Sequence, residues 1–167
     1  MTAKPRVSLE DVAGELEIEP NEMSFYLNKE TGEFYSISDV DMGDFETGDL
    51  DEQIEGAYEW RQNEIRRIKE VLTSSDWVQL PSAYQIHDYN IMRDFCYTIE
   101  NDDVHEDLLH QIRGRGAFGR FKEAIHRHGI AQDWYDYRFE VYKRIARSFL
   151  EAEGIPYVEK GEVSDGK

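Results

Sequence analysis

The chain has 167 residues, 40% of them hydrophobic, which is sufficient for one domain with a buried core. Its formal net charge of −17 disfavours binding to nucleic acid or anionic membranes, and the longest apolar run, three residues, excludes a membrane span. The single cysteine, Cys96, lies in the apolar stretch DFCYTI and is expected to be a small buried side chain. We therefore expect a cytoplasmic protein with a single domain over residues 1–167, flexible at 1–7 and 160–167.

The first elements are a short helix and a hairpin. Ser8 is expected to cap a helix that ends before Pro20. Four apolar residues of this helix lie on one stripe: Leu9, Val12, Ala13 and Leu16. The next stretch, MSFYLNKETGEFYSIS, alternates apolar and polar residues on both sides of a turn that contains Gly32, and it predicts a β-hairpin.

An acidic segment follows, with eleven acidic residues and no Lys or Arg between residues 30 and 60. We expect its first part to be a solvated loop and its second part to begin a helix over about 50–73. Six residues are predicted to form the buried stripe of that helix: Ile54, Ala57, Tyr58, Ile65, Ile68 and Leu72.

The remaining chain predicts one more strand and then helices. DWVQLP is expected to form a third strand beside the hairpin, and IPYVEK an edge strand. Four helices are expected, at about 86–100, 103–113, 117–128 and 131–153. The predicted fold is α+β: a small antiparallel sheet of about three strands packed by four to six helices, with an all-helical C-terminal half.

The stretch GRGAFGRFKEAI, residues 114–125, has the glycine spacing of a phosphate-binding loop. A dinucleotide-binding loop follows a strand, whereas a helical pattern precedes this one, so we reject that interpretation. Gly114 is instead expected to end one helix, Gly116 to begin the next, and Gly119 to let a neighbouring backbone come close. Three apolar side chains are expected to face the core: Phe118, Phe121 and Ile125.

The start of this second helix is a candidate anion-binding site. The first N–H groups, at Ala117 and Phe118, have no side-chain cap, and basic residues surround them. The candidate residues are Arg113, Arg115, Gly116, Ala117, Arg120, Lys122 and Arg127. The anion is either an external phosphate-type ligand or the protein's own carboxylates, from residues 39–55 or from Asp133 and Asp136. The acidity of the chain favours the second alternative.

No metal, cofactor or catalytic residue is predicted. His105 and His110 are five residues apart, about 140° around a helix, and do not share a face for one metal ion. A calcium loop beginning at Asp39 has the wrong residues at three required positions. The sequence also shows no nucleophile with an evident histidine partner.

Residues 134–150, WYDYRFEVYKRIARSFL, interleave aromatic and basic side chains. Such a segment either stacks on nucleic-acid bases or faces the core, and the helical spacing favours the core. The expected core-facing residues are Tyr135, Phe139, Tyr142, Ala146 and Phe149, with Trp134, Val141 and Ile145 alongside.

Several of these stretches together resemble a bacterial family of uncharacterised proteins. They are YLNKETGEFYSISD, LPSAYQIHDYNIMRDF, and GRGAFGRFKEAI followed by GIAQDWYDYRFE. The family signature is Gly-basic-Gly-Ala-Phe-x-x-Phe-Lys followed by a Trp-Tyr helix, and the resemblance covers most of the chain. It implies a single-domain bacterial protein and no particular activity, cofactor or catalytic residue.

Three functions remain open. The leading hypothesis is a non-enzymatic interaction or regulatory module that binds an unknown protein partner, because acidic residues gather at 30–60 and basic residues at 113–147. The first alternative is a phosphate-ligand or RNA-binding protein that uses residues 113–127. The second is an enzyme whose site is not visible in the sequence. The oligomeric state stays open.

Overall fold

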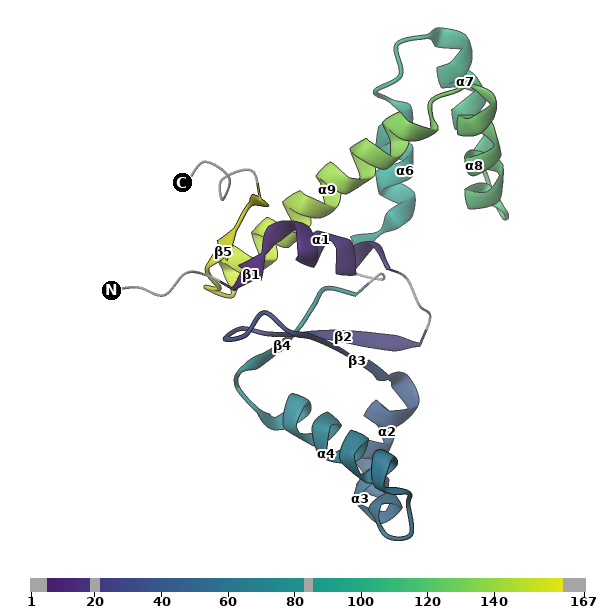
Figure 1. Cartoon of the computed structure of the whole chain (residues 1–167). Coiled ribbons are helices and arrows are strands. Elements are labelled where there is room, and N and C mark those ends of the chain that lie inside the picture. The colour runs from purple at the N-terminus through teal and green to yellow at the C-terminus, as the bar shows by residue number, and fades with distance from the viewer. Residues whose placement is uncertain (1–5, 19–21, 83–85, 161–167) are drawn as a thin grey trace.

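The computed structural model describes residues 6–18, 22–82 and 86–160, and its fold is α+β, as predicted (Figure 1). In chain order the elements are β1 (Val7–Ser8), α1 (Leu9–Glu17), β2 (Met23–Asn28), β3 (Phe34–Ser38), α2 (Asp39–Thr47), α3 (Asp49–Ile54), α4 (Glu59–Thr73), β4 (Trp77–Gln79), α6 (Asp88–Cys96), α7 (Asp102–Gln111), α8 (Ala117–Arg127), α9 (Ala131–Ala152) and β5 (Tyr157–Val158). Within these ranges no helix is long and apolar enough to cross a membrane.

The central sheet has the antiparallel order β3-β2-β4, which confirms both the predicted hairpin and the predicted third strand. The hairpin turn requires Gly32, because its φ is +78° and an added Cβ would lie 2.6 Å from the carbonyl oxygen of Arg6. A second, two-stranded sheet pairs β1 with β5 in parallel, with Val7 opposite Tyr157. Val7, which the sequence placed in a flexible arm, is therefore buried in a strand.

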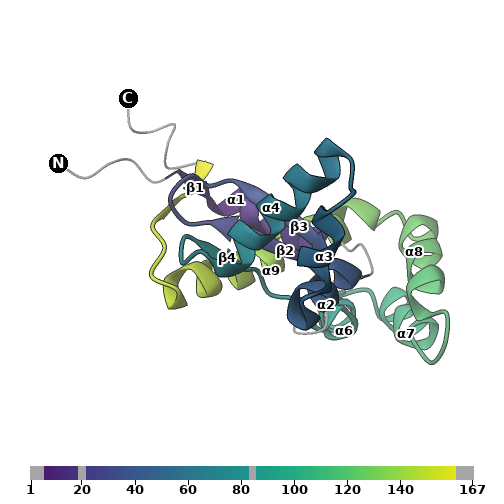
Figure 2. The same ribbon diagram turned by 90° about the horizontal axis from the view of Figure 1, so that it is seen from below.

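Both faces of the central sheet are covered by helices, so the sheet is a middle layer (Figure 1). Leu27 on one face joins the larger core cluster, which includes α1 and α6–α9. Tyr26 and Ile37 on the other face join a smaller cluster with α3 and α4. We call residues 39–73, which contain α2, α3 and α4, the acidic lobe, and residues 88–152, which contain α6–α9, the helical region. Figure 2 shows the same arrangement from below the acidic lobe.

The acidic lobe differs from the prediction in two respects. The expected loop is wrong, because residues 39–47 form α2, which Ser38 caps by accepting a hydrogen bond from the Asp41 N–H at 3.1 Å. The expected continuous helix over 50–73 is also wrong, because it is broken at Gly56, whose φ is +84°. Since the new helix begins only at Glu59, Tyr58 leaves the predicted buried stripe and is 79% exposed. These two changes explain why the described residues contain eight helices and not four to six.

In the helical region the four predicted helices are confirmed as α6–α9, with shorter ends. Gly114 and Gly116 have positive φ values, as the helix-to-helix turn requires, but a Cβ on Gly119 would meet open space, so the expected close backbone approach is wrong. Phe118 and Tyr135 were expected in the core and are 48% and 44% exposed. They lie beside the buried stripes of α8 and α9.

Cys96 is buried at the end of α6, as expected, and burial raises the pKa of its thiol to about 11. A thiol with such a pKa carries almost no thiolate at neutral pH, which makes it a packing residue and not a nucleophile.

Candidate functional site

The loop between α7 and α8 is held by Arg120, one of the candidate anion-binding residues. Its Nε donates to the carbonyl oxygen of Gln111 at 2.9 Å, and its two terminal nitrogens donate to the carbonyl oxygens of Arg113 and Arg115. The guanidinium thus satisfies carbonyls that the end of α7 leaves free. Arg120 has a structural role within the turn, and the side chain lies against Gly116.

Arg127 has an internal carboxylate partner. Its Nη2 lies 2.7 Å from Oδ2 of Asp107 on α7, and His128 Nε2 contacts the same oxygen at 2.7 Å. Hydrogen bonds from His128, Gln111 and Arg127 lower the pKa of Asp107 to about 2. The anion that Arg127 binds is therefore the protein's own carboxylate, but it belongs to Asp107 of α7 and not to any of the segments predicted from the sequence.

The acidic segment named as an internal partner lies elsewhere, and Asp136, the second residue of the other named pair, accepts a hydrogen bond from Gln132. Residues 39–55 form the far end of the molecule from α8 (Figure 1). Their ion pairs with Arg61 and Lys69, at 2.8 and 2.5 Å, stay inside the acidic lobe. Three exposed candidates have no ion pair among the described residues: Arg113, Arg115 and Lys122. Of the predicted site, only these three cations remain available to an external anion.

A cleft that the sequence did not reveal lies between the end of α1, the start of α6, α8 and α9, and we call it the α8–α9 cleft. Its volume is about 250 Å³. Its lining residues come from four elements: Glu17, Asp88, Phe118, Phe121, Lys122, Trp134, Tyr135 and Arg138. The stretches GRGAFGRFKEAI and WYDYRFE, which carry the family resemblance, supply six of them.

The polar wall of this cleft is a hydrogen-bonded network around Tyr142. The hydroxyl of Tyr142, which is fully buried, donates to Asp88, and Arg138 Nη2 donates to that hydroxyl at 3.2 Å. The Arg138 guanidinium lies 4.7 Å from the centre of the Tyr142 ring, and its Nη1 lies 3.6 Å from the carboxylate of Glu17. Burial, assisted by the hydrogen bond to Asp88, raises the pKa of Tyr142 well above its usual range. Tyr142 is therefore a neutral hydrogen-bond donor and not a general base.

The backbone at the start of α6 positions Asp88. His87, the residue before the helix, has a φ of +59°, a left-handed conformation that is uncommon for residues other than glycine. The turn at His87 directs the carboxylate of Asp88, the first residue of α6, toward α9, where the hydroxyl of Tyr142 donates a hydrogen bond to it. Asp88 and Tyr142 are 54 residues apart, so no local spacing in the sequence could have joined them.

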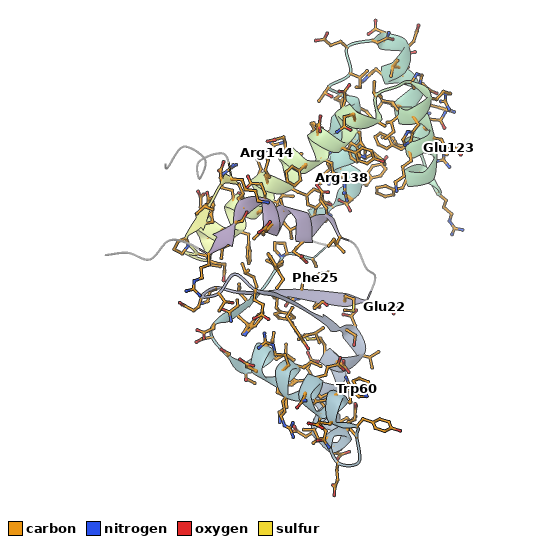
Figure 3. The ribbon with its side chains drawn as sticks, in the orientation of Figure 1. Glu22, Phe25, Trp60, Glu123, Arg138 and Arg144 are labelled. Atoms are coloured by element: carbon orange, nitrogen blue, oxygen red, sulfur yellow. The ribbon has the colours of Figure 1, made fainter. Side chains whose placement is uncertain are left out.

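A third feature lies on the acidic lobe and combines exposed apolar side chains with uncompensated carboxylates. Val40, Tyr58 and Trp60 are 71%, 79% and 66% exposed. The ion pair between Arg61 and Asp41 joins the starts of α4 and α2. We call this the acidic aromatic surface; its carboxylates outside the ion pairs are Asp39, Asp44, Glu46, Asp49, Glu52, Glu55 and Glu59. Figure 3 shows Trp60 in the lobe remote from Arg138 and Arg144 of α9.

Metal binding has no evident centre in the part of the chain that the structure describes. No three side chains of His, Cys, Asp or Glu are grouped there in a way that could hold a metal ion.

Comparison with known proteins gives a single relationship. The search of curated proteins and the search of solved structures gave no match. A family model matches residues 7–165 and thus spans all the elements described above. The chain belongs to the uncharacterised protein family UPF0158.

Proposed function

We propose that the protein is a non-enzymatic interaction module whose acidic aromatic surface binds a basic segment of a partner protein. The observation that carries this proposal is the exposure of Tyr58 and Trp60, at 79% and 66%, within a lobe rich in carboxylates. Large aromatic side chains are ordinarily buried, and they are enriched among the residues that contribute most to binding at protein interfaces.

The chemistry of this surface favours a partner that contains Arg and Lys. The lobe has eleven acidic and only four basic side chains, and three of the basic ones already pair with carboxylates: Arg61, Arg67 and Lys69. Carboxylates would attract a basic segment at long range, and the rings of Tyr58 and Trp60 would then contact its cations and aliphatic stems. The same charge repels nucleic acid. The proposal places this binding in the cytoplasm, where a single buried cysteine is well suited to the reducing conditions.

The tryptophan fluorescence of the protein provides a direct test. Trp77 and Trp134 are 7% and 5% exposed, so the emission typical of a solvent-exposed tryptophan comes from Trp60. We expect a short Lys- and Arg-rich peptide to shift the Trp60 emission and to protect it from acrylamide, whereas a Glu- and Asp-rich peptide of equal length leaves it unchanged. Binding should weaken steeply as salt is raised.

Two variants make this test specific. Tyr58→Ala retains the Trp60 signal and should lower the affinity for the basic peptide about fivefold or more, as expected for an aromatic residue central to an interface. Tyr97→Ala is the matched control, because Tyr97 is 64% exposed but lies in the helical region. An unchanged Trp60 emission, or an equal loss in both variants, would contradict the proposal.

A second candidate function, binding of RNA or a phosphate ligand, rests on the exposed cations Arg113, Arg115 and Lys122. The test is a mobility shift of single-stranded RNA at low salt, with Arg115→Ala and Lys122→Ala as the variants. Arg120 is unsuitable because it holds the α7–α8 turn. If no shift occurs at low salt, this candidate is eliminated.

A further inference from the structure

We infer that the α8–α9 cleft binds a small aromatic anion: a planar ring that carries a carboxylate or phosphate group. The ring would lie against Phe118 and Tyr135, and the anionic group would meet the ammonium of Lys122. This site is separate from the acidic aromatic surface, and the inference does not depend on the proposed function.

The aromatic part of the inference rests on how α8 and α9 meet. Phe121 and Trp134 are buried, with ring centres 4.9 Å apart in an edge-to-face arrangement. Phe118 and Tyr135 also line the cleft but are 48% and 44% exposed, so they present aromatic surface that the described residues leave uncovered. A planar ring entering the cleft would cover this surface and gain aromatic contacts.

The charge of the ligand follows from which cleft residues are already compensated. Asp88 accepts the hydrogen bond from Tyr142, and both Asp88 and Glu17 face Arg138, at 4.0 and 3.6 Å. Lys122, in contrast, takes part in none of the ion pairs formed among the described residues. Glu17 and Asp88 thus share Arg138, and Lys122 is the charged lining residue without an ion pair among the described residues, so an anionic group beside it would gain a charged partner.

The size of the cleft limits the ligand. Its volume of about 250 Å³ lies below the range of about 300–1,000 Å³ that is typical of sites for drug-sized ligands and cofactors. A single or fused ring with one substituent fits this volume, whereas a complete nucleotide does not. A cationic ligand is disfavoured because both carboxylates of the cleft, Glu17 and Asp88, already face Arg138, whereas Lys122 would repel the ligand.

The test uses the isotope-labelled full chain and heteronuclear NMR, with benzoate, phenyl phosphate, benzylammonium and acetate as probes. We expect benzoate or phenyl phosphate to shift the indole N–H signal of Trp134 and the amide signals of residues 118–122. The stronger of the two identifies the anionic group. Benzylammonium, which has the ring with the opposite charge, and acetate, which has no ring, should bind at least about tenfold more weakly.

Variants at the rim provide the decisive comparison. Lys122→Gln should lower the affinity for the tighter-binding anionic probe about tenfold, and Lys122→Arg should retain most of the affinity for that probe. Arg115→Gln is the control, because Arg115 is also exposed and forms no ion pair with the described residues, but it does not line the cleft. The inference is overturned if Trp134 does not respond, if benzylammonium binds equally well, or if Arg115→Gln has the effect expected of Lys122→Gln.

Discussion

The acidic lobe and the helical region contain nearly the same number of acidic side chains, eleven in residues 39–73 and twelve in residues 88–152, but differ in basic ones, with four against ten. In the helical region, the nearly equal numbers allow ion pairs between helices, such as that between Asp107 and Arg127. In the acidic lobe most carboxylates have no such partner. The comparison teaches that the acidic lobe has a net charge of −7 against −2 for the longer helical region, so a partner of opposite charge would be attracted to the lobe.

The tryptophans of the two regions also differ. Trp134 of the helical region is 5% exposed and packs against Phe121, which is 1% exposed, whereas Trp60 and the neighbouring Tyr58 of the acidic lobe face solvent. The buried pair stabilises the fold, and the exposed pair is available for binding.

The largest expected effect tests this contrast by truncating one aromatic residue in each region. Phe121→Ala should lower the free energy of unfolding by about 3–5 kcal/mol, because it leaves a cavity beside Phe95 and Trp134. Trp60→Ala should change it by less than about 0.5 kcal/mol, as for other surface substitutions. Urea titration followed by circular dichroism measures both. Comparable losses would show that Trp60 is part of the core and would remove the contrast.

The next effect concerns the one arginine that joins the three helices of the acidic lobe. Arg61 pairs with Asp41 of α2 and Glu64 of α4 and donates to Gln53 of α3 at 3.0 Å. Arg61→Gln should cost about 1–2 kcal/mol, because a partly buried carboxylate loses a charged partner. Arg66→Gln on the same helix is the control, with an expected change below about 0.5 kcal/mol. Equal unfolding midpoints for both variants would argue against a role of Arg61 in holding the lobe.

The smallest effect is a pH dependence in the helical region. Because the folded pKa of Asp107 is lowered from 3.8 to about 2, its ion pairs stabilise the fold above about pH 4, and that stabilisation is lost as the pH falls toward 2. Its side chain is 28% exposed, so we expect only about 0.5–1 kcal/mol. The unfolding free energies of the protein and of Asp107→Asn should differ at neutral pH and converge near pH 2. A difference that stays constant with pH would contradict this assignment.

Much of the fold could be predicted because its signals are local. The cap at Ser8, the turn glycine at Gly32, the left-handed Gly114 after a helix and the helix start at Gly116 depend on adjacent residues, and all four are confirmed. The acidic lobe was mispredicted because its pattern is ambiguous. Acidic residues at the start of a helix are favourable, yet a run of them also suggests a solvated loop, and the break at Gly56 outweighs the apolar spacing around it.

The candidate sites were less predictable because they depend on contacts between distant segments. The exposed cations near α8 could be named from the sequence, but the use of Arg120 on backbone carbonyls could not, since it requires the path of the turn. The α8–α9 cleft combines Glu17, Asp88 and two helices from the C-terminal half. Helical spacing placed Phe118 and Tyr135 in the core, although both lie at the edge of a stripe, where exposure depends on the neighbouring helix.

The central claim is that the acidic lobe, and not the helical region, receives a basic partner. The most direct measurement is a chemical-shift map of the isotope-labelled full chain during titration with a Lys- and Arg-rich peptide. The account predicts that the shifted signals concentrate in residues 39–60, include the indole N–H of Trp60, and return toward their free positions as salt is added. Shifts that concentrate in residues 113–147, or their complete absence at low salt, would contradict it.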